Sequence, residues 1–226
     1  MIVVHEVRSS DSSYVEKITH GRTERDGYAI RPAECCWHMV VVRHDGRARA
    51  LVVGPWTTAG VASWAEGAEI LWVRFGLGTF MPHLPTRDLL DTETVLPDAT
   101  GRSFWLGGSA WRFPDHENVE TFVEKLAREG VLARDPVVGA ALEGRPPQGL
   151  SPRTVRHRFS RAMGLTQGGI RQVERANRAA ALLRQGVPIF DTVYEEGYFD
   201  QPHMTRSLRR WLGRTPAQIA AASKSL

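Results

Sequence analysis

The sequence predicts an α+β protein, in which a mostly β N-terminal domain with the form of a barrel or sandwich (residues 1–115) precedes an all-α domain (residues 116–226). Two observations predict the architecture. Apolar runs bounded by glycine and proline favour short strands in the first half, and one helical pattern occurs twice in the second half. The 226 residues are enough for two domains of ordinary size.

Three apolar runs in the first half have the length and composition of strands. Residues 36–42 and 48–53 flank the turn sequence His44-Asp45-Gly46, and residues 69–75 lie between two glycines. Six of the seven tryptophans also belong to residues 1–115. They can fill the core of a small β domain, and some can line a pocket for an apolar or aromatic effector. The residues predicted to line that effector pocket are Trp37, Trp56, Trp72 and Arg74.

Residues 197–216 predict a turn, a capped helix and a second turn. Gly197 suits the first turn, Asp200 can cap the helix with its carboxylate, and Pro202 fits the first helical turn. Apolar residues recur at helical spacing, which predicts one buried face: Met204, Leu208, Trp211 and Leu212. The opposite face carries polar and cationic side chains, namely Gln201, His203, Arg206 and Arg210.

The same pattern occurs 49 residues earlier, where residues 154–166 align with residues 203–215. Arg161, Gly164 and Thr166 are identical in the second copy, and Ser151-Pro152 can begin the first helix. A short helix is predicted before each copy, at 135–142 and 188–196, which completes two helix-turn-helix units at about 135–164 and 188–213. Residues 169–185 are predicted to form the long helix that joins them.

The charge of the two halves favours a nucleic-acid partner for the second. Residues 1–115 have 12 Lys and Arg against 14 Asp and Glu, whereas residues 145–226 have 14 against 5. Basic helices with a polar face can contact phosphates and base edges. A membrane surface is the weaker interpretation, because the apolar faces of these helices are needed for the core.

Residues 117–222 resemble the C-terminal half of the AraC/XylS-type bacterial transcription regulators, most specifically over 197–216. The resemblance implies two helix-turn-helix units that read the major groove of an operator about one helical turn (~34 Å) apart. It also implies double-stranded DNA as partner, with a homodimer and RNA polymerase as further candidates. The DNA-binding residues it implies are Arg153, Thr154, Arg156 and His157 in the first unit, and Gln201, His203 and Arg206 in the second. Arg161 and Arg210, further along the same helices, are also predicted to bind DNA.

Residues 35–100 are more loosely similar to the N-terminal region of one subgroup of these regulators. That similarity implies a sensory or dimerising role, and the small-molecule effector is unknown. The function predicted is therefore sequence-specific transcription regulation under effector control.

Two alternatives remain open: a non-specific architectural DNA-binding protein, and a regulator with a metal- or redox-sensing site at Cys35-Cys36. Zinc needs about four ligands, however, and no second Cys/His cluster lies near Cys35, Cys36 and His38 in the sequence. We therefore predict no metal, no cofactor and no catalytic residue, since no enzymatic motif is present. No secretory signal or apolar span is found either, so the sequence predicts a cytoplasmic protein.

Overall fold

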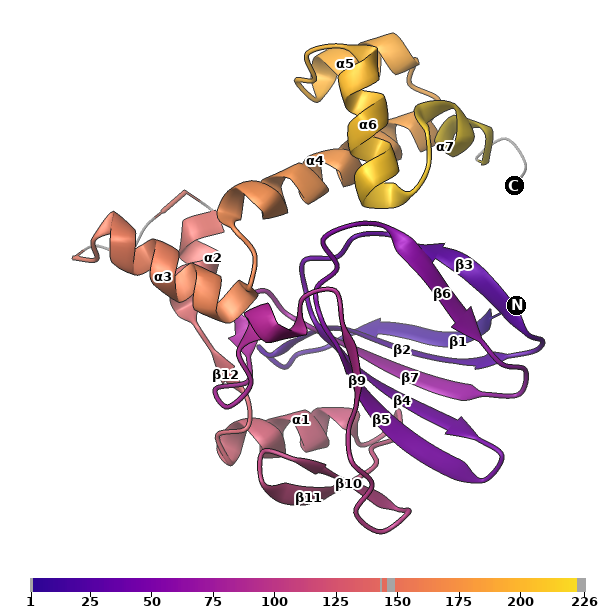
Figure 1. Ribbon diagram of the computed structural model, residues 1–226, viewed down its shortest axis with the longest axis vertical. Coiled ribbons are helices and arrows are strands. Elements are labelled where there is room, and N and C mark those ends of the chain that lie inside the picture. Colours follow the sequence, from indigo (N-terminus) through magenta and orange to yellow (C-terminus); the bar gives the residue numbers. More distant parts are fainter. Residues whose placement is uncertain (1, 143, 146–148, 223–226) are drawn as a thin grey trace. The chain divides into compact units, whose positions relative to one another are not determined.

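The computed structural model describes residues 2–142, 144–145 and 149–222. Its largest β element is an antiparallel six-stranded sheet, in which the strand order is β1-β2-β7-β4-β5-β9 (Figure 1). The strands are β1 (Ile2–Ser9), β2 (Val15–Thr23), β7 (Glu69–Phe75), β4 (His38–His44), β5 (Arg47–Val53) and β9 (Glu93–Val95).

The sheet is open, so the prediction of a barrel form was wrong for the described residues. Closure would require the edge strands β1 and β9 to pair with each other, yet each is paired on one side only. The predicted strands themselves are confirmed as β4, β5 and β7. Asp45 and Gly46 join β4 to β5 with φ values of 50° and 71°, as a tight hairpin turn of the primed type requires.

The main core covers one face of the sheet. Alternate residues of β4 and β7, such as Met39, Val41, Leu71 and Val73, are buried there. In the same core lie residues of helix α1 (Val119–Arg128) and of the hairpin β10 (Ser103–Leu106)–β11 (Ser109–Arg112).

Helix α1 is also fixed to β1 by polar contacts of Glu120. The Ser10 hydroxyl donates to its carboxylate at 2.6 Å, and an Arg8 guanidinium nitrogen lies 2.8 Å from it. The hydrogen bond from Ser10, followed by the contact with Arg8, lowers the pKa of Glu120 from its ordinary value.

The described residues form two compact units, neither of which is continuous in sequence. Unit 1 is drawn from 1–28, 36–55 and 63–166, and unit 2 from 29–35, 56–62 and 167–226. The boundaries of these units differ from the predicted division between residues 115 and 116. That division is a prediction about which parts of the chain fold independently, and it stays a prediction.

Unit 1 contains the sheet and two of the predicted helices, α2 (Pro136–Leu142) and α3 (Pro152–Met163). The C-terminal turn of α3 contacts the segment 78–89, which includes β8 (Thr79–Phe80) and the short helix η1 (Thr86–Leu89). The Thr86 hydroxyl donates to the Ala162 carbonyl at 3.0 Å, and the Gly78 N–H donates to the Met163 sulfur at 3.2 Å. Strand β12 (Ala133–Arg134) pairs with β8 just before α2.

Unit 2 contains the helices α4 (Gln167–Arg184), α5 (Ile189–Glu195), α6 (Gln201–Leu212) and α7 (Pro216–Ala222). Helix α4 confirms the predicted long helix, and apolar and small residues along one of its faces, which we call the seam, are buried. Helices α5, α6 and α7 each contact α4. The buried residues of the seam are Ile170, Val173, Ala176, Ala179, Ala180 and Leu183.

Two segments of the N-terminal half, residues 29–35 and 56–62, also belong to unit 2, and we call them the arm. They include most of the paired strands β3 (Gly27–Arg31) and β6 (Gly60–Trp64). The Ala33 N–H donates to the Trp211 carbonyl at 2.6 Å, and the Ala59 N–H donates to the Arg210 carbonyl at 2.8 Å. The arm thus satisfies carbonyl groups that the end of α6 leaves without intrahelical partners.

A glycine substitution tests the contact between the arm and α6. Gly213 ends α6 with φ of 69°, and an added Cβ would lie 2.7 Å from Ile30 Cγ2 and 3.2 Å from Ala59 Cβ. We expect Gly213→Ala to lower the free energy of unfolding by about 1–2 kcal/mol for the left-handed backbone, and by about 1 kcal/mol more for displacing the arm. Chemical denaturation followed by circular dichroism measures this loss.

Gly197→Ala is the matched control, because Gly197 has a similar φ of 64° and no described heavy atom lies within 4 Å of its added Cβ. It should show the backbone cost alone. Equal losses in the two variants would mean that the arm does not press on the end of α6.

Candidate nucleic-acid interface

The ends of α6 are set by local interactions that the sequence predicted. The Asp200 carboxylate accepts a hydrogen bond from the His203 N–H at 2.6 Å, Pro202 lies in the first turn, and Gly213 takes the left-handed conformation at the C-terminus. The predicted apolar stripe is confirmed as the buried face: Met204, Leu208, Trp211 and Leu212.

The opposite face of α6 presents polar side chains to solvent. Gln201, Arg206 and Arg210 are exposed as predicted, and so is Arg209, which the sequence reasoning did not include among the DNA-binding residues. Its spacing of three residues from Arg206 is the signal that could have identified it. No described carboxylate forms an ion pair with Arg206, Arg209 or Arg210. These cations can therefore meet an external anion without breaking a salt bridge in the described part of the chain.

His203 occupies a more constrained position than the other predicted residues of this helix. It is half-buried, its Nδ1 accepts a hydrogen bond from the Phe199 N–H at 3.3 Å, and its ring meets the buried Tyr198 edge-on at 5.3 Å between centroids. Tyr198 is in turn bonded to Ser207 at 3.2 Å and lies under the Arg175 guanidinium of α4. His203 thus helps to fix the start of α6, and a DNA contact through its other nitrogen stays a prediction.

Helix α3 has the same construction as α6. The Ser151 hydroxyl accepts from the Thr154 N–H at 3.1 Å, Pro152 begins the helix, and Gly164 ends it with φ of 66°. Phe159, Ala162 and Met163 are buried. All five residues predicted to bind DNA in this unit are exposed: Arg153, Thr154, Arg156, His157 and Arg161.

Asp135 joins α2 to α3. One of its carboxylate oxygens caps the Val137 N–H at 2.9 Å, and the other accepts from Arg158 Nε at 2.9 Å. Arg158 is therefore engaged within the protein, unlike its exposed neighbours on α3. His157 and Arg161 lie beside this ion pair at a hollow of about 400 Å³, where the Arg161 guanidinium lies 5.6 Å from the centre of the Phe80 ring.

The four residues predicted for an effector pocket occupy three different surroundings. Trp37 is buried in the main core, where it stacks on Phe75 at 3.8 Å and donates to the Thr79 carbonyl at 2.8 Å. Trp72 packs on the other face of the sheet, and Arg74, two residues along β7, lies 3.4 Å from the Glu16 carboxylate. Trp56 belongs to the arm, where Arg31 lies 3.3 Å over its ring. Within unit 1, Trp37 and Trp72 therefore lie on opposite faces of the sheet, and the role of all four residues in effector binding stays a prediction.

Cys35 and Cys36 are buried, and neither forms a disulfide with a described residue. The Cys36 sulfur lies 3.8 Å from the Glu16 carboxylate. Within the described residues, no group of three or more His, Cys, Asp or Glu side chains is arranged to hold a metal ion. No helix in the same part of the chain is long and apolar enough to cross a membrane.

The helical segment that carries the exposed arginines also matches a known family. Residues 148–222, which run from just before α3 to the end of α7, match the model of a family described as a helix-turn-helix domain. No curated protein and no solved structure matches the chain. The match supports a DNA-binding transcription regulator of the AraC type.

Proposed function

We propose that this protein is a sequence-specific transcription regulator whose two helix-turn-helix units, about 135–164 and 188–213, bind one double-stranded operator as part of a homodimer. The observation that carries the proposal is that α6 has one buried apolar face and one exposed face. The exposed face carries three arginines, and none of them forms an ion pair with a residue that the structure describes. A recognition helix needs such a face, because arginine can pair with phosphate oxygens and with the O6 and N7 atoms of guanine.

The similarity between α3 and α6 supports the proposal that both act as recognition helices. Both run for 12 residues between a capped start with proline and a left-handed glycine, and each follows a helix of 7 residues. The connections differ, since residues 143–151 precede α3 and residues 196–200 precede α6. Under this proposal Gln201, Arg206, Arg153 and Arg156 read bases from the first two turns of each helix. Arg161, Arg209 and Arg210 contact phosphates.

DNA binding is expected to be sequence-specific and strongly dependent on salt. If each reading helix makes several phosphate contacts, the logarithm of the association constant should fall with the logarithm of salt concentration with a slope of about −0.9 per contact. Selection from random duplexes, followed by titrations of the selected site at several salt concentrations, measures both properties. Equal affinity for selected and scrambled duplexes at physiological salt would favour the architectural alternative instead.

We further propose that a small molecule bound by the N-terminal half controls DNA binding. The arm supports this idea, because one segment leads through residues 36–37 into β4, the other follows β5 after residues 54–55, and their N–H groups donate to carbonyls in the last turn of α6. A ligand that alters the path of these segments can then alter the reading helix. Thermodynamic linkage requires that ligand and operator change each other's affinity by the same factor, which a pair of reciprocal titrations checks.

A further inference from the structure

A row of charged side chains continues the core face of the sheet beyond its last apolar row. Arg22 of β2 pairs with Glu69 of β7, which pairs with Arg43 of β4. Directly opposed residues of antiparallel strands project from the same face, and so do residues two apart along a strand. The neighbouring row on this face, two residues along each strand, is largely apolar: His20, Leu71, Val41 and Ala50. Charge thus replaces the expected apolar residues where the core ends.

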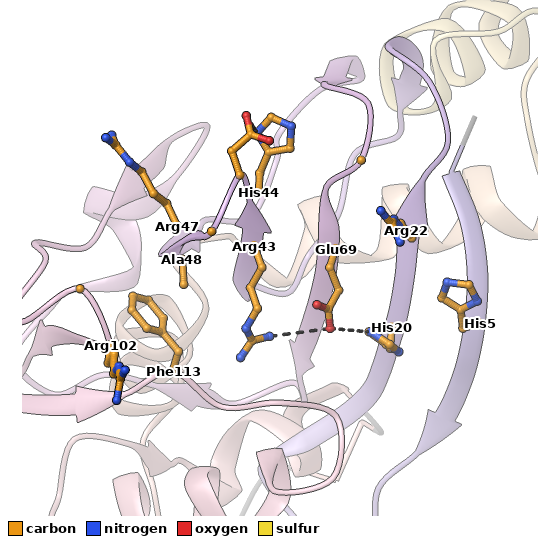
Figure 2. A pocket seen from close by; sticks show the side chains of 14 residues that line it. His5, His20, Arg22, Arg43, His44, Arg47, Ala48, Glu69, Arg102 and Phe113 are labelled. Atoms are coloured by element: carbon orange, nitrogen blue, oxygen red, sulfur yellow. Dashed lines mark hydrogen bonds and ion pairs between the residues drawn. The ribbon is translucent and has the colours of Figure 1, made fainter.

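This row forms one wall of a cavity of about 660 Å³, whose lining comes entirely from unit 1. Figure 2 shows Glu69 between Arg43 and His20, with Arg22 and His5 on one side and Arg102 and Phe113 on the other. The volume is within the range of small-molecule sites. Arg47, which follows the β4–β5 turn, is the fourth arginine of the lining.

The carboxylates of this cavity leave most of the arginine charge unbalanced. Glu69 lies 3.1 Å from His20 Nε2 and 3.9 Å from Arg43, and Arg43 also donates to the Pro114 carbonyl at 2.7 Å. Asp45, the second lining carboxylate, is 86% exposed and contacts His44. Neither carboxylate reaches Arg22, Arg47 or Arg102, and no other described residue forms an ion pair with these three.

Imidazole rings extend the wall beyond Glu69. The register of β1 against β2 shifts between Val4 and Glu6, so His5 is the extra residue of a β-bulge. Its ring lies 5.6 Å from that of His20, which stacks on His116 at 4.7 Å. His20 is therefore in ring contact with both His5 and His116, while its Nε2 lies 3.1 Å from the Glu69 carboxylate.

We propose that this cavity, which we call the arginine pocket, binds a small organic oxyanion. Arg22, Arg47 and Arg102 line one hollow without a described ion pair, and their planar guanidinium forks match the geometry of phosphate and carboxylate groups. Ala48 and Phe113 supply an apolar surface for the carbon part of the ligand. The arginine pocket can bind an oxyanion whether or not the protein regulates transcription. The further claim that this ligand is the effector rests on the proposed function.

The test uses the full chain and titration calorimetry at constant ionic strength, with phenyl phosphate, inorganic phosphate and phenol as probes. Phenyl phosphate should bind most tightly, because it combines the anion with a ring, and phenol should not bind at the same concentration. Arg22→Ala and Arg102→Ala should each weaken phenyl phosphate binding by about tenfold, the usual effect of losing a hydrogen bond to a charged group. Arg128→Ala is the control, since it removes the same charge from the exposed end of α1.

Absence of phenyl phosphate binding at millimolar concentration would overturn the proposal, as would equal binding by the pocket variants and Arg128→Ala. The same variants are then titrated with the selected operator. If they lose DNA affinity and the unaltered protein does not bind phenyl phosphate, the arginines contact nucleic acid and the pocket is not a small-molecule site. If specific DNA binding fails while phenyl phosphate binds as expected, the regulator proposal fails and the arginine pocket stands.

Discussion

Leu208→Ala is expected to lower the free energy of unfolding by about 2–5 kcal/mol, the usual cost of truncating a buried leucine. Leu208 is fully buried on the apolar face of α6, which packs against α4, α5 and α7. Such a loss is comparable with much of the stability of an ordinary domain, so operator binding should fall together with the folded fraction. Urea denaturation followed by circular dichroism, with parallel binding titrations, measures both effects.

Two controls separate loss of packing from loss of an exposed side chain of α6. Leu208→Met nearly conserves the side-chain volume and should cost less than about 1.5 kcal/mol. Arg209→Ala removes an exposed side chain of the same helix and should change stability by no more than about 0.5 kcal/mol. If Leu208→Ala unfolded at the same urea concentration as Leu208→Met, the packing described for α6 would be wrong.

Arg206→Ala is expected to weaken operator binding by about 1–3 kcal/mol and to relax the preference at one base pair. Arg206 is exposed in the second turn of α6, where a recognition helix contacts base edges. Arg210 lies one turn later, with its guanidinium over the Trp211 ring at 4.5 Å. Arg210→Ala should weaken binding to all duplexes by a similar factor, because Arg210 is expected to contact phosphates.

Titrations with the selected operator and its single-base-pair variants distinguish these two outcomes. Arg206→Lys supplies a further comparison, because lysine keeps the charge and loses the planar fork. It should retain the salt dependence of binding and lose the base preference. Unchanged affinity and unchanged preference in Arg206→Ala would show that α6 does not read bases through this residue.

The helices α3 and α6 could be predicted from the sequence because their signals are local. Asp200 and Pro202 at the start of α6, and Gly213 at its end, act within one turn of their own positions. The strands β4, β5 and β7 were also predicted, since apolar runs between glycines mark buried strands. Strand β2 was not predicted, because its sequence, VEKITHGRT, is mostly polar and does not alternate between apolar and polar residues.

The proposed arginine pocket could not be located in the same way, because the face on which a strand residue lies depends on the register of distant partners. Trp72 was grouped with Trp37, yet the structure places it on the sheet face opposite the main core. Arg22, Arg43 and Glu69 are separated by more than 20 residues from one another, and only the pairing of three strands makes them neighbours. The contacts of the arm with α6 are likewise backbone hydrogen bonds, which side-chain patterns do not encode.

The discontinuous units have a consequence for how this protein could be recombined. The chain passes between them at 28/29, 35/36, 55/56, 62/63 and 166/167. A single crossover between residues 62 and 201 of two related genes would therefore separate α6 from the segments whose N–H groups complete its last turn. A hybrid protein made by exchanging all residues after 115 would combine the arm of one parent with helix α6 of the other. Functional chimeras should require residues 29–35 and 56–62 to be exchanged together with residues 167–222.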